Sequence, residues 1–452
     1  MDKELWNKIL HFDFDDTLSE YGFSIRLAHE NYWTKNFTEQ AILEYKKFMY
    51  LAATSDFMVS PSKIVDIVWH QHLIFTQSYQ DFCKIIGKQI QHIPSTHNRE
   101  DFEKFKQAKE RTKKYYFSYF GEQPKCVWEF DSMFESLNLS KSKIKIRTFI
   151  IFGILAFLLF TIPFYFLLKP LYLIIKNPEF IFMFLGLAII TFISLGIFNG
   201  IKFKEITKYF DKDSFIYSLQ PLELIYLKKQ NLSYIINGTV NELVINKNIK
   251  VNNDNTIELV KSEETTKSEN LLTITTLKEL GKSFYPALLK KLESKPLFKN
   301  NKNCMDAFKK YFYKSEKFGK LFYLNFGTLM LLLMLGFIRL IIGISRDKPI
   351  IIITIVLIIS TVLIILYLNR LTKLVCTKTI PDLYKNQILQ TLQNKGNWQW
   401  KYFLLGTSVL SPSFAPLINY VDNNPNNGSS SGSSCGSSCG SSCSGCGGCG
   451  GN

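Results

Sequence analysis

Side chains that could bind a metal or move a proton gather in one stretch of this 452-residue chain. All six histidines lie before residue 98, and two of them belong to an Asp-x-x-Trp-His-x-His run. Imidazole, thiolate and carboxylate are the groups through which proteins bind zinc and other soft metals. The candidate ligand or metal residues are Asp66, His70, His72, Cys83, His92 and His97.

The spacing of these residues limits how they could meet. In a straight helix His70 and His72 point about 160° apart, so they cannot bind one ion together. Cys83 would lie roughly 16 Å from His72 along the axis, too far to share a metal. A metal site would therefore need His70 or His72 together with His92 or His97, returning from the loop that follows.

A second relation on the same helix concerns Asp66 and His70. They stand at positions i and i+4, where a carboxylate can fix the tautomer of an imidazole. Three interpretations stay open for the histidines: packed structural side chains, a metal or small-ligand site, and acid–base catalysis. No residue is assigned a catalytic role.

Five more thiols lie in a Gly/Ser-rich tail that contains no apolar residues to fold around an ion. In a reducing compartment they could bind a soft metal or be modified, and in an oxidising one they would cross-link. Drift of a tolerated disordered tail is the alternative. These tail thiols are Cys435, Cys439, Cys443, Cys446 and Cys449.

One further motif suggests a reaction. Asp13, Asp15 and Thr17 match the Asp-x-Asp-x-Thr loop of haloacid-dehalogenase-like phosphatases, in which the first carboxylate attacks phosphorus and Mg²⁺ neutralises the phosphate. That loop needs a buried strand directly upstream. Residues 5–11 have helical spacing instead, which argues against a phosphatase.

The first 140 residues are expected to fold as an all-α domain that positions these side chains. Apolar spacing predicts helices over 24–31, 37–53, 62–86 and 101–120, with Ser60-Pro61 as a helix start. Residues 4–129 resemble the glycine-rich-domain-containing-protein-like family. The resemblance rests on Arg26-Leu27-Ala28-His29-Glu30-Asn31, Trp33, Glu44-Tyr45-Lys46-Lys47-Phe48, the Asp-x-x-Trp-His-x-His core, Tyr79, Phe82-Cys83, His92, Pro94-Ser95 and Trp128. It implies a helical domain and brings no established reaction.

Four apolar runs, at 149–168, 180–198, 321–344 and 350–368, are each long enough to cross a bilayer. They predict two transmembrane hairpins. Lys and Arg flank the outer ends of both hairpins, while the tips carry only two cations each, so the soluble segments should face the cytoplasm of an inner (cell) membrane. Arg339, near the far end of the third run, is expected to snorkel to the interface, and a functional charge within the membrane is the alternative.

The net charge of +16 is spread over lysines in every soluble segment. It is explained by adhesion to anionic headgroups of the lipid bilayer. No arginine-rich helix or aromatic-basic motif supports a specific nucleic-acid partner.

Between the hairpins the pattern changes to helices at 219–229 and 232–244, a hairpin at 249–260, and helices at 271–292 and 303–313. Helix, helix and hairpin give the outline of a winged-helix-like α+β unit. The run Gln220-Pro221-Leu222-Glu223-Leu224 and the later hairpin are similar to bacterial membrane proteins that end in a Gly/Cys low-complexity tail. A protein-interaction role is favoured over DNA binding, because both ends are tethered to the membrane.

After the last span, 381–393 is expected to form an amphipathic helix, and 398–421 is mildly apolar. Trp398, Trp400 and Tyr402 are suited to the membrane interface, but Pro412 and Pro416 argue against a fifth crossing. The expected units are 1–140 all-α, 149–198 first hairpin, 199–320 α+β, 321–368 second hairpin, 370–421 juxtamembrane and 422–452 disordered.

The sequence thus predicts a mainly α, multi-pass membrane protein. The leading hypothesis is a non-enzymatic scaffold that presents cytoplasmic domains and a Cys/Gly tail for binding or assembly with protein partners. The alternative is a membrane-tethered enzyme that depends on zinc, another soft metal or a ligand and is centred on the Trp-His-x-His helix.

Overall fold

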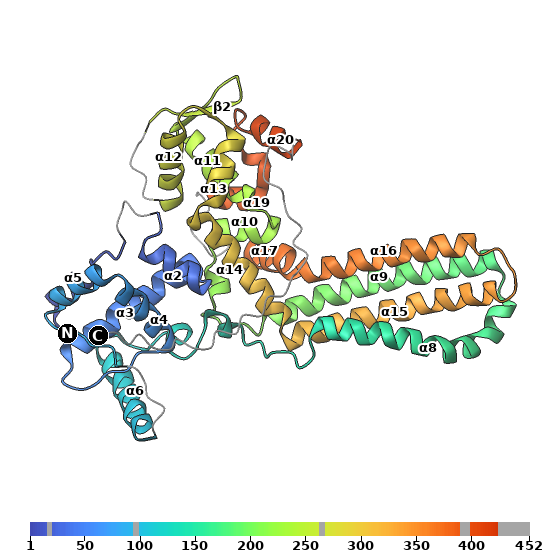
Figure 1. Ribbon diagram of the computed structural model, residues 1–452, viewed down its shortest axis with the longest axis horizontal. Helices are drawn as coiled ribbons and strands as arrows, with labels where there is room; N and C mark the ends of the chain where they lie inside the picture. The colour runs from blue at the N-terminus through green and yellow to red at the C-terminus, as the bar shows by residue number, and fades with distance from the viewer. Residues whose placement is uncertain (16–19, 94–98, 262–266, 389–397, 424–452) are drawn as a thin grey trace, which may run out of the picture.

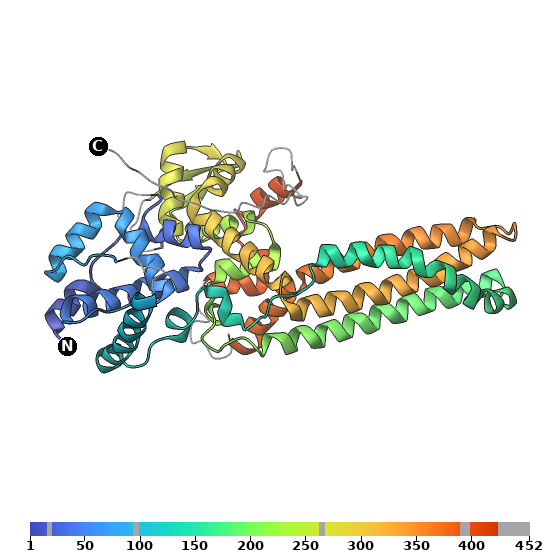
Figure 2. The same ribbon diagram turned by 60° about the horizontal axis from the view of Figure 1, so that its bottom comes forward.

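The computed structural model describes residues 1–15, 20–93, 99–261, 267–388 and 398–423. A globular part, to which the N-terminal residues and the described segment after the last long helix contribute, adjoins a long bundle of four helices (Figure 1). The same separation is visible after a 60° turn (Figure 2). Helices dominate and strands are few and short, which confirms the mainly α class.

The N-terminal domain consists of helices packed around one aromatic-rich core. Thr34 and Ser62 cap α3 and α4 by accepting from the backbone N–H groups three positions ahead. The helix start predicted at Ser60-Pro61 therefore lies two residues too early. Phe48, Met49 and Tyr50 of α3 and Val65 and Val68 of α4 fill the core. The helices are α1 (Lys3–Leu10), α2 (Phe23–Asn31), α3 (Lys35–Thr54), α4 (Lys63–Ile74), α5 (Thr76–Ile86), α6 (Arg99–Phe120) and α7 (Lys125–Trp128), followed by the 3-10 turn Met133–Leu137.

The single helix predicted over 62–86 is wrong. Phe75 has φ −87° and ψ 66°, outside the helical region, so α4 ends at Ile74 and α5 begins at Thr76. The break folds α5 back, and the Phe82 ring centroid lies 5.5 Å from that of His72. The separation of roughly 16 Å along a straight axis therefore does not apply to this chain.

Four helices are long and apolar enough to cross a membrane among the residues described, which confirms the four predicted spans and fits a membrane protein. They are α8 (Ile146–Ile174), α9 (Asn177–Thr207), α15 (Glu316–Ile344) and α16 (Ile351–Leu374), and α8 continues through Pro163 and Pro170. α15 is the most buried of the four, while the other three turn large aliphatic side chains outward. An outward apolar surface of this extent is what a lipid environment requires.

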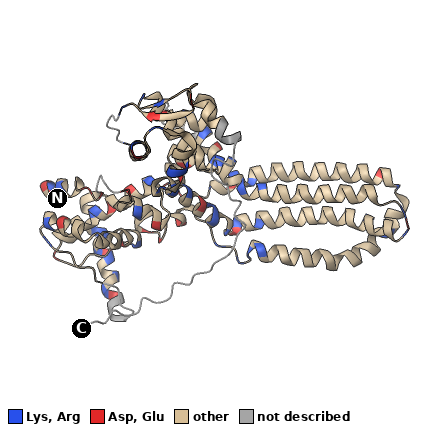
Figure 3. Cartoon of the chain, turned by 45° about the horizontal axis from the view of Figure 1, so that its top comes forward, with Lys and Arg blue, Asp and Glu red and all other residues tan. Residues whose placement is uncertain are grey.

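Charged side chains mark the two ends of the bundle differently. Lys and Arg cluster where the bundle meets the globular part, and few lie along the helices (Figure 3). The cluster includes Lys145, Lys204 and Lys320, which belong to three different connections into the bundle.

The Arg339 guanidinium reaches the turn between α8 and α9 at the far end of the bundle. The Arg339 side chain is 8 % exposed, and it donates to the carbonyl oxygens of Tyr172 and Ile175 and to Asn177 Oδ1, the last at 2.7 Å. These acceptors stand at the end of α8 and the start of α9, where helical carbonyls have no partner within the helix. Arg339, which belongs to α15 in the second hairpin, thus caps the end of α8 in the first.

A polar cluster crosses the bundle nearer the globular part. Asn199 and Asn325 exchange amide hydrogen bonds of 2.8 Å in both directions, and Asn199 also donates to the Tyr367 hydroxyl at 2.8 Å. The pair joins α9 to α15, and Tyr367 adds α16. Polar pairs of this kind fix which helices pack together in lipid.

The segment between the two transmembrane hairpins has the predicted order of helix, helix and β-hairpin, but one of its later helices differs from the prediction. Its elements are α10 (Pro221–Lys229), α11 (Ser233–Ile245), β1 (Ile249–Val251), β2 (Thr256–Leu259), α12 (Ser268–Leu280), β3 (Ser283–Phe284), α13 (Tyr285–Ser294) and α14 (Pro296–Tyr313). The strands form one antiparallel sheet in the order β1-β2-β3. The single helix predicted over 271–292 is wrong, because Gly281, at φ +65°, ends α12 and lets Ser283 pair with Ile257.

The segment after the last span packs back onto the middle domain. It runs through a π-helical turn (Val375–Thr379), α17 (Ile380–Leu383), a second π turn (Tyr384–Ile388), α19 (Trp398–Leu405), a 3-10 turn (Gly406–Val409) and α20 (Ala415–Asn423). Tyr402 is buried and donates to the Tyr234 carbonyl at 3.1 Å, so its predicted place at a membrane interface is wrong. The predicted disordered tail, with all five thiols, lies outside the described residues from 424 onward.

One hydrophobic core runs through both globular domains to the base of the bundle. The backbone segment just before α8 is hydrogen-bonded to the segment just before α15. Ser142 N donates to Lys314 O and Glu316 N donates to Ser140 O, each at 2.7 Å. The two hairpins are thereby joined at their base as well as along their length.

Candidate functional site

Helix α4 presents a polar face to solvent because its apolar side chains are buried on the other side. Val65, Val68 and Trp69 are buried, whereas Asp66 and His70 stand one turn apart on the outer face. The nearest oxygen of Asp66 lies 3.5 Å from His70 Nε2. The i, i+4 relation expected from the sequence is thus realised as a contact.

His92 reaches this face from the segment that follows α5. Gly87, at φ +70°, ends α5, and an extended segment then runs back beside α4. The Tyr79 hydroxyl donates to the Ile90 carbonyl and fixes the segment to the core. The Trp69 ring packs edge-on against the imidazole of His92, with 4.7 Å between centroids.

The three side chains meet closely. His92 Nε2 lies 2.9 Å from Asp66 Oδ1, and the centroids of the His70 and His92 rings are 4.3 Å apart. One ligand atom from each residue can be chosen so that all three lie within 4.8 Å of one another. We call this group, Asp66, His70 and His92, the Asp/His cluster.

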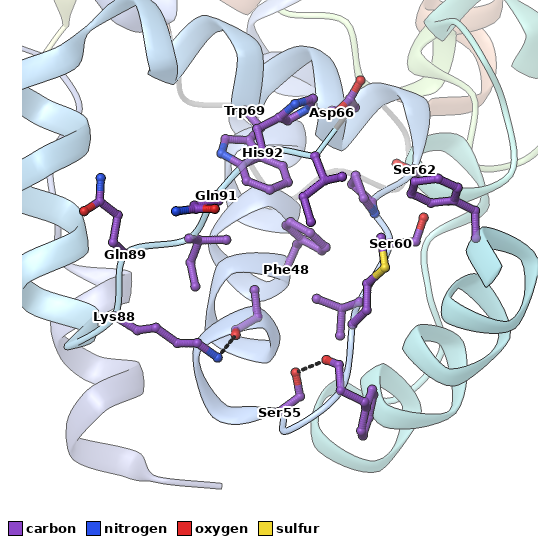
Figure 4. Close-up of a pocket in the computed structure, with 18 of the residues that line it drawn as sticks. Phe48, Ser55, Ser60, Ser62, Asp66, Trp69, Lys88, Gln89, Gln91 and His92 are labelled. Atoms are coloured by element: carbon purple, nitrogen blue, oxygen red, sulfur yellow. Dashed lines mark hydrogen bonds and ion pairs between the residues drawn. The ribbon is translucent and has the colours of Figure 1, made fainter. Parts of the chain in front are cut away.

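A cavity of about 880 Å³ opens beside the Asp/His cluster. Trp69, Asp66 and His92 lie together on one side of the cavity, and Phe48 lines it further in (Figure 4). Its two sides are the loop that precedes α4 and the extended segment after α5. A volume of this size accommodates a small organic molecule.

The rim of the cavity is polar but largely engaged in local hydrogen bonds. Lys88 Nζ donates to the Ala52 carbonyl at 3.3 Å, and Ser55 Oγ donates to the Phe57 carbonyl at 3.0 Å. Ser62 Oγ accepts from Val65 N at 3.2 Å as the cap of α4. The hydroxyls of Ser55 and Ser62 thus stabilise the local backbone, and neither is hydrogen-bonded to a base as an activated nucleophile would be.

His72 belongs to the core and not to the cluster. It has no exposed surface and lies among the rings of Phe14, Phe23 and Phe82. Its Nδ1 lies 2.9 Å from the Tyr45 hydroxyl. Burial lowers the pKa of His72 to about 4, so the ring is neutral at physiological pH.

The remaining candidates do not join the cluster in the part of the chain that is described. Cys83 is buried in α5 and is not among the ligand atoms that meet at Asp66. His97 and the five tail thiols fall outside the described residues. The first six candidates thus divide into three that meet, His72 and Cys83 in the core, and one without a described position.

The phosphatase-like motif has a structural role where it is described. A helix, α1, precedes it instead of a buried strand. Asp15 Oδ1 accepts from Ser24 N at 2.9 Å at the start of α2, and Asp13 Oδ1 accepts from Asp15 N at 3.0 Å. These carboxylates brace a turn, while Thr17 lies outside the described residues.

Several residues that shape the site carried no signal in the sequence. Lys88 lines the cavity through the path of the chain and not through any motif, and Ser60-Pro61, in the loop that also lines it, was singled out only as a helix start. Glu44, buried at the centre of the domain, accepts from Lys47 Nζ at 2.7 Å, from the Tyr116 hydroxyl at 2.8 Å and from Trp128 Nε1 at 2.7 Å. In the sequence, Glu44 was named only as part of the Glu-Tyr-Lys-Lys-Phe run that carries the resemblance, and no structural role was predicted for it.

Comparison with known proteins places a family match over this domain. A family model described as UCP032817-like matches residues 8–118, a stretch that contains the Asp/His cluster and every residue lining the cavity. No curated protein and no solved structure matches the chain. The N-terminal quarter of the chain is therefore similar to the UCP032817-like family, whose description names no activity.

Proposed function

We propose that this protein is a multi-pass protein of the cell (inner) membrane whose globular part faces the cytoplasm and acts as a non-enzymatic binding module. The observation that carries the proposal is the cavity of about 880 Å³ in a domain joined by a continuous core to the base of the spans. The cavity supplies a place for a ligand, and the core connects that place to the membrane.

The distribution of positive charge supports the cytoplasmic orientation. Lys and Arg gather where the bundle meets the globular part (Figure 3), and such residues are retained on the cytoplasmic side during insertion. The opposite end carries fewer cations, and its innermost one, Arg339, is bonded to backbone carbonyls.

Direct bonds between the domains support a rigid platform. Glu223, at the start of α10, is buried and accepts from Lys35 N at 3.1 Å, at the start of α3, and from Gln220 N at 2.7 Å. Burial raises the pKa of Glu223 to about 7, against the lowering effect of these two donors. Asp211 N donates to Ser136 O at 2.9 Å on the other side of the junction.

The proposed partners are proteins or small molecules that bind the globular part. The resemblance of residues 4–129 to the glycine-rich-domain-containing-protein-like family is in keeping with this proposal. A membrane-tethered, metal- or ligand-dependent enzyme is the second candidate. The Asp/His cluster favours it, because two imidazoles and a carboxylate can serve catalysis as well as binding.

Sidedness is tested by placing a reporter that is active only in the cytoplasm after residue 423 or within the tip at Asp347. Activity at 423 and none at 347 is expected, and the reverse pattern would contradict the orientation.

Binding is tested by native mass spectrometry of the full chain released from detergent. Val59→Trp fills the cavity, and Leu43→Trp, on an exposed face of α3, is the matched control. We expect co-purified ligand mass on the wild type and on L43W that is absent from V59W. Equal bound mass on all three chains would overturn the cavity as the binding place.

A further inference from the structure

The separations within the Asp/His cluster agree with those between ligands of one metal ion. Zinc binds imidazole nitrogen and carboxylate oxygen at about 2.0–2.2 Å, so two tetrahedral ligands stand about 3.3 Å apart. The cluster has 2.9 Å between Asp66 Oδ1 and His92 Nε2 and 3.5 Å between Asp66 Oδ2 and His70 Nε2. One ligand atom from each of the three residues lies within 4.8 Å of the other two, so binding an ion would draw these atoms together by side-chain rotation.

The donor set identifies the class of ion. Two imidazoles with one carboxylate suit zinc and divalent iron, whereas Ca²⁺ and Mg²⁺ take oxygen ligands. Three protein ligands leave at least one coordination position open, as in sites where the metal meets a further molecule. Because Asp66 and His92 also line the cavity, an ion held between them lies at the cavity wall.

Each ligand is held by elements that do not depend on the ion. Asp66 and His70 are fixed one turn apart on α4, which is capped by Ser62 and packed through Val65 and Val68. His92 is only 17 % exposed at its side chain and is held by the ring of Trp69. A site prepared in this way needs little ordering when it binds.

We propose that Asp66, His70 and His92 bind one divalent transition-metal ion of the zinc class, whose open position faces a ligand in the adjoining cavity. This inference rests on the proposed binding function and specifies its ligand: a small molecule with an anionic donor, such as a carboxylate or phosphate. One carboxylate leaves a net charge of +1 on a bound Zn²⁺. On the cavity lining the positive charge of Lys88 is balanced by that of Asp56, and Lys63 is paired with Asp131, so the preference for an anionic donor comes from the bound ion itself.

A different explanation of the cluster is an ion pair between Asp66 and protonated imidazoles. The two explanations make opposite predictions for added metal, since an ion pair needs none. The tail thiols would also take up zinc, so the measurement uses the full chain with all five tail cysteines changed to serine.

The test is isothermal titration of the detergent-purified, chelator-treated chain with Zn²⁺, repeated with Co²⁺ to record its visible absorption. We expect one equivalent of Zn²⁺ and a Co²⁺ spectrum of nitrogen and oxygen ligands without a thiolate band. His70→Gln and His92→Gln are each expected to weaken binding by at least about 100-fold, because even an outer-shell partner of a metal ligand is worth 10–100-fold.

His70 is 58 % exposed at its side chain, so H70Q leaves the fold intact even if H92Q does not. His11→Gln, at the exposed residue that caps the C-terminus of α1, is the matched control and should bind like the parent. Absence of binding in the parent, or equal binding in H70Q and the parent, would overturn the metal site. Either result leaves the comparison of V59W with L43W unaffected, so failure of this inference is distinguishable from failure of the binding function.

Discussion

The neutral, buried His72 should make the N-terminal domain sensitive to acid. Its pKa is about 4 in the folded chain against 6.5 for an ordinary histidine. A histidine whose pKa is lowered by folding contributes its full stability above pH 6.5 and loses it as the pH falls toward 4, because the unfolded chain takes up the proton first. The whole shift corresponds to about 3 kcal/mol, of which about 2 kcal/mol is lost by pH 5.

The perturbation that isolates this effect is His72→Gln, which keeps a polar side chain but cannot be protonated. Other groups titrate in both proteins, so the quantity to compare is the change in stability between pH 7.5 and pH 5. The assay is hydrogen exchange of the full chain in detergent, read by mass spectrometry on peptides from α4 and corrected for the intrinsic rate at each pH. It yields the free energy of opening for that region.

We expect the opening free energy of α4 to fall about 2 kcal/mol further in the wild type than in H72Q over this interval. H72Q should itself be less stable at pH 7.5, because it loses the contact with the Tyr45 hydroxyl and the packing of the imidazole against Phe14 and Phe82. An equal loss of stability in both proteins would refute the assignment of His72 as a buried neutral core residue.

Three further outcomes are expected. Glu44→Ala should destabilise the N-terminal domain by about 3–5 kcal/mol, seen as faster proteolysis, because it removes a buried carboxylate and leaves the paired ammonium without its partner. Asn325→Leu leaves Asn199 without its reciprocal amide bonds and should cost about 1 kcal/mol, measured by unfolding in mixed micelles. Gly336→Val should disrupt the bundle, because a Cβ there lies 2.5 Å from a neighbouring leucine methyl, whereas Gly327→Val meets nothing within 4 Å; thermal aggregation in detergent compares the two.

The sequence predicted the helical class and the four spans because both depend on local pattern. Runs of apolar residues about 20 long have few alternatives to a membrane helix. Periodicity could not predict the break at Phe75, since the apolar positions of α4 and α5 stay in step across it. The prediction for Tyr402 was wrong for a similar reason. A tyrosine side chain suits a membrane interface, but tertiary packing places this one in a hydrogen bond to the Tyr234 carbonyl.

The candidate site was only partly predictable. The relation between Asp66 and His70 follows from helical spacing and appears in the structure as a contact of 3.5 Å. The helix was predicted to end at residue 86, directly before the turn at Gly87. The return of His92 to the same face also depends on the bond from Tyr79 to Ile90, which no local pattern encodes. The position of His72 within a shell of aromatic rings likewise reflects contacts from the segment after α1 and from α2, α3 and α5 together.

The pairing of the chain at the entries to α8 and α15 bears on how the protein is made. Ser140 and Glu316, which contact each other there, are 176 positions apart. Ribosomes add about 5–20 residues each second, so α15, the helix against which α8 and α9 pack, is made on the order of 10–30 s after them. During that interval Asn199 and the carbonyls that Arg339 later caps have no companion from the second hairpin. The first hairpin alone therefore leaves these polar groups without their partners in the bundle. We expect the insertion machinery to cover them until the second hairpin has been translated.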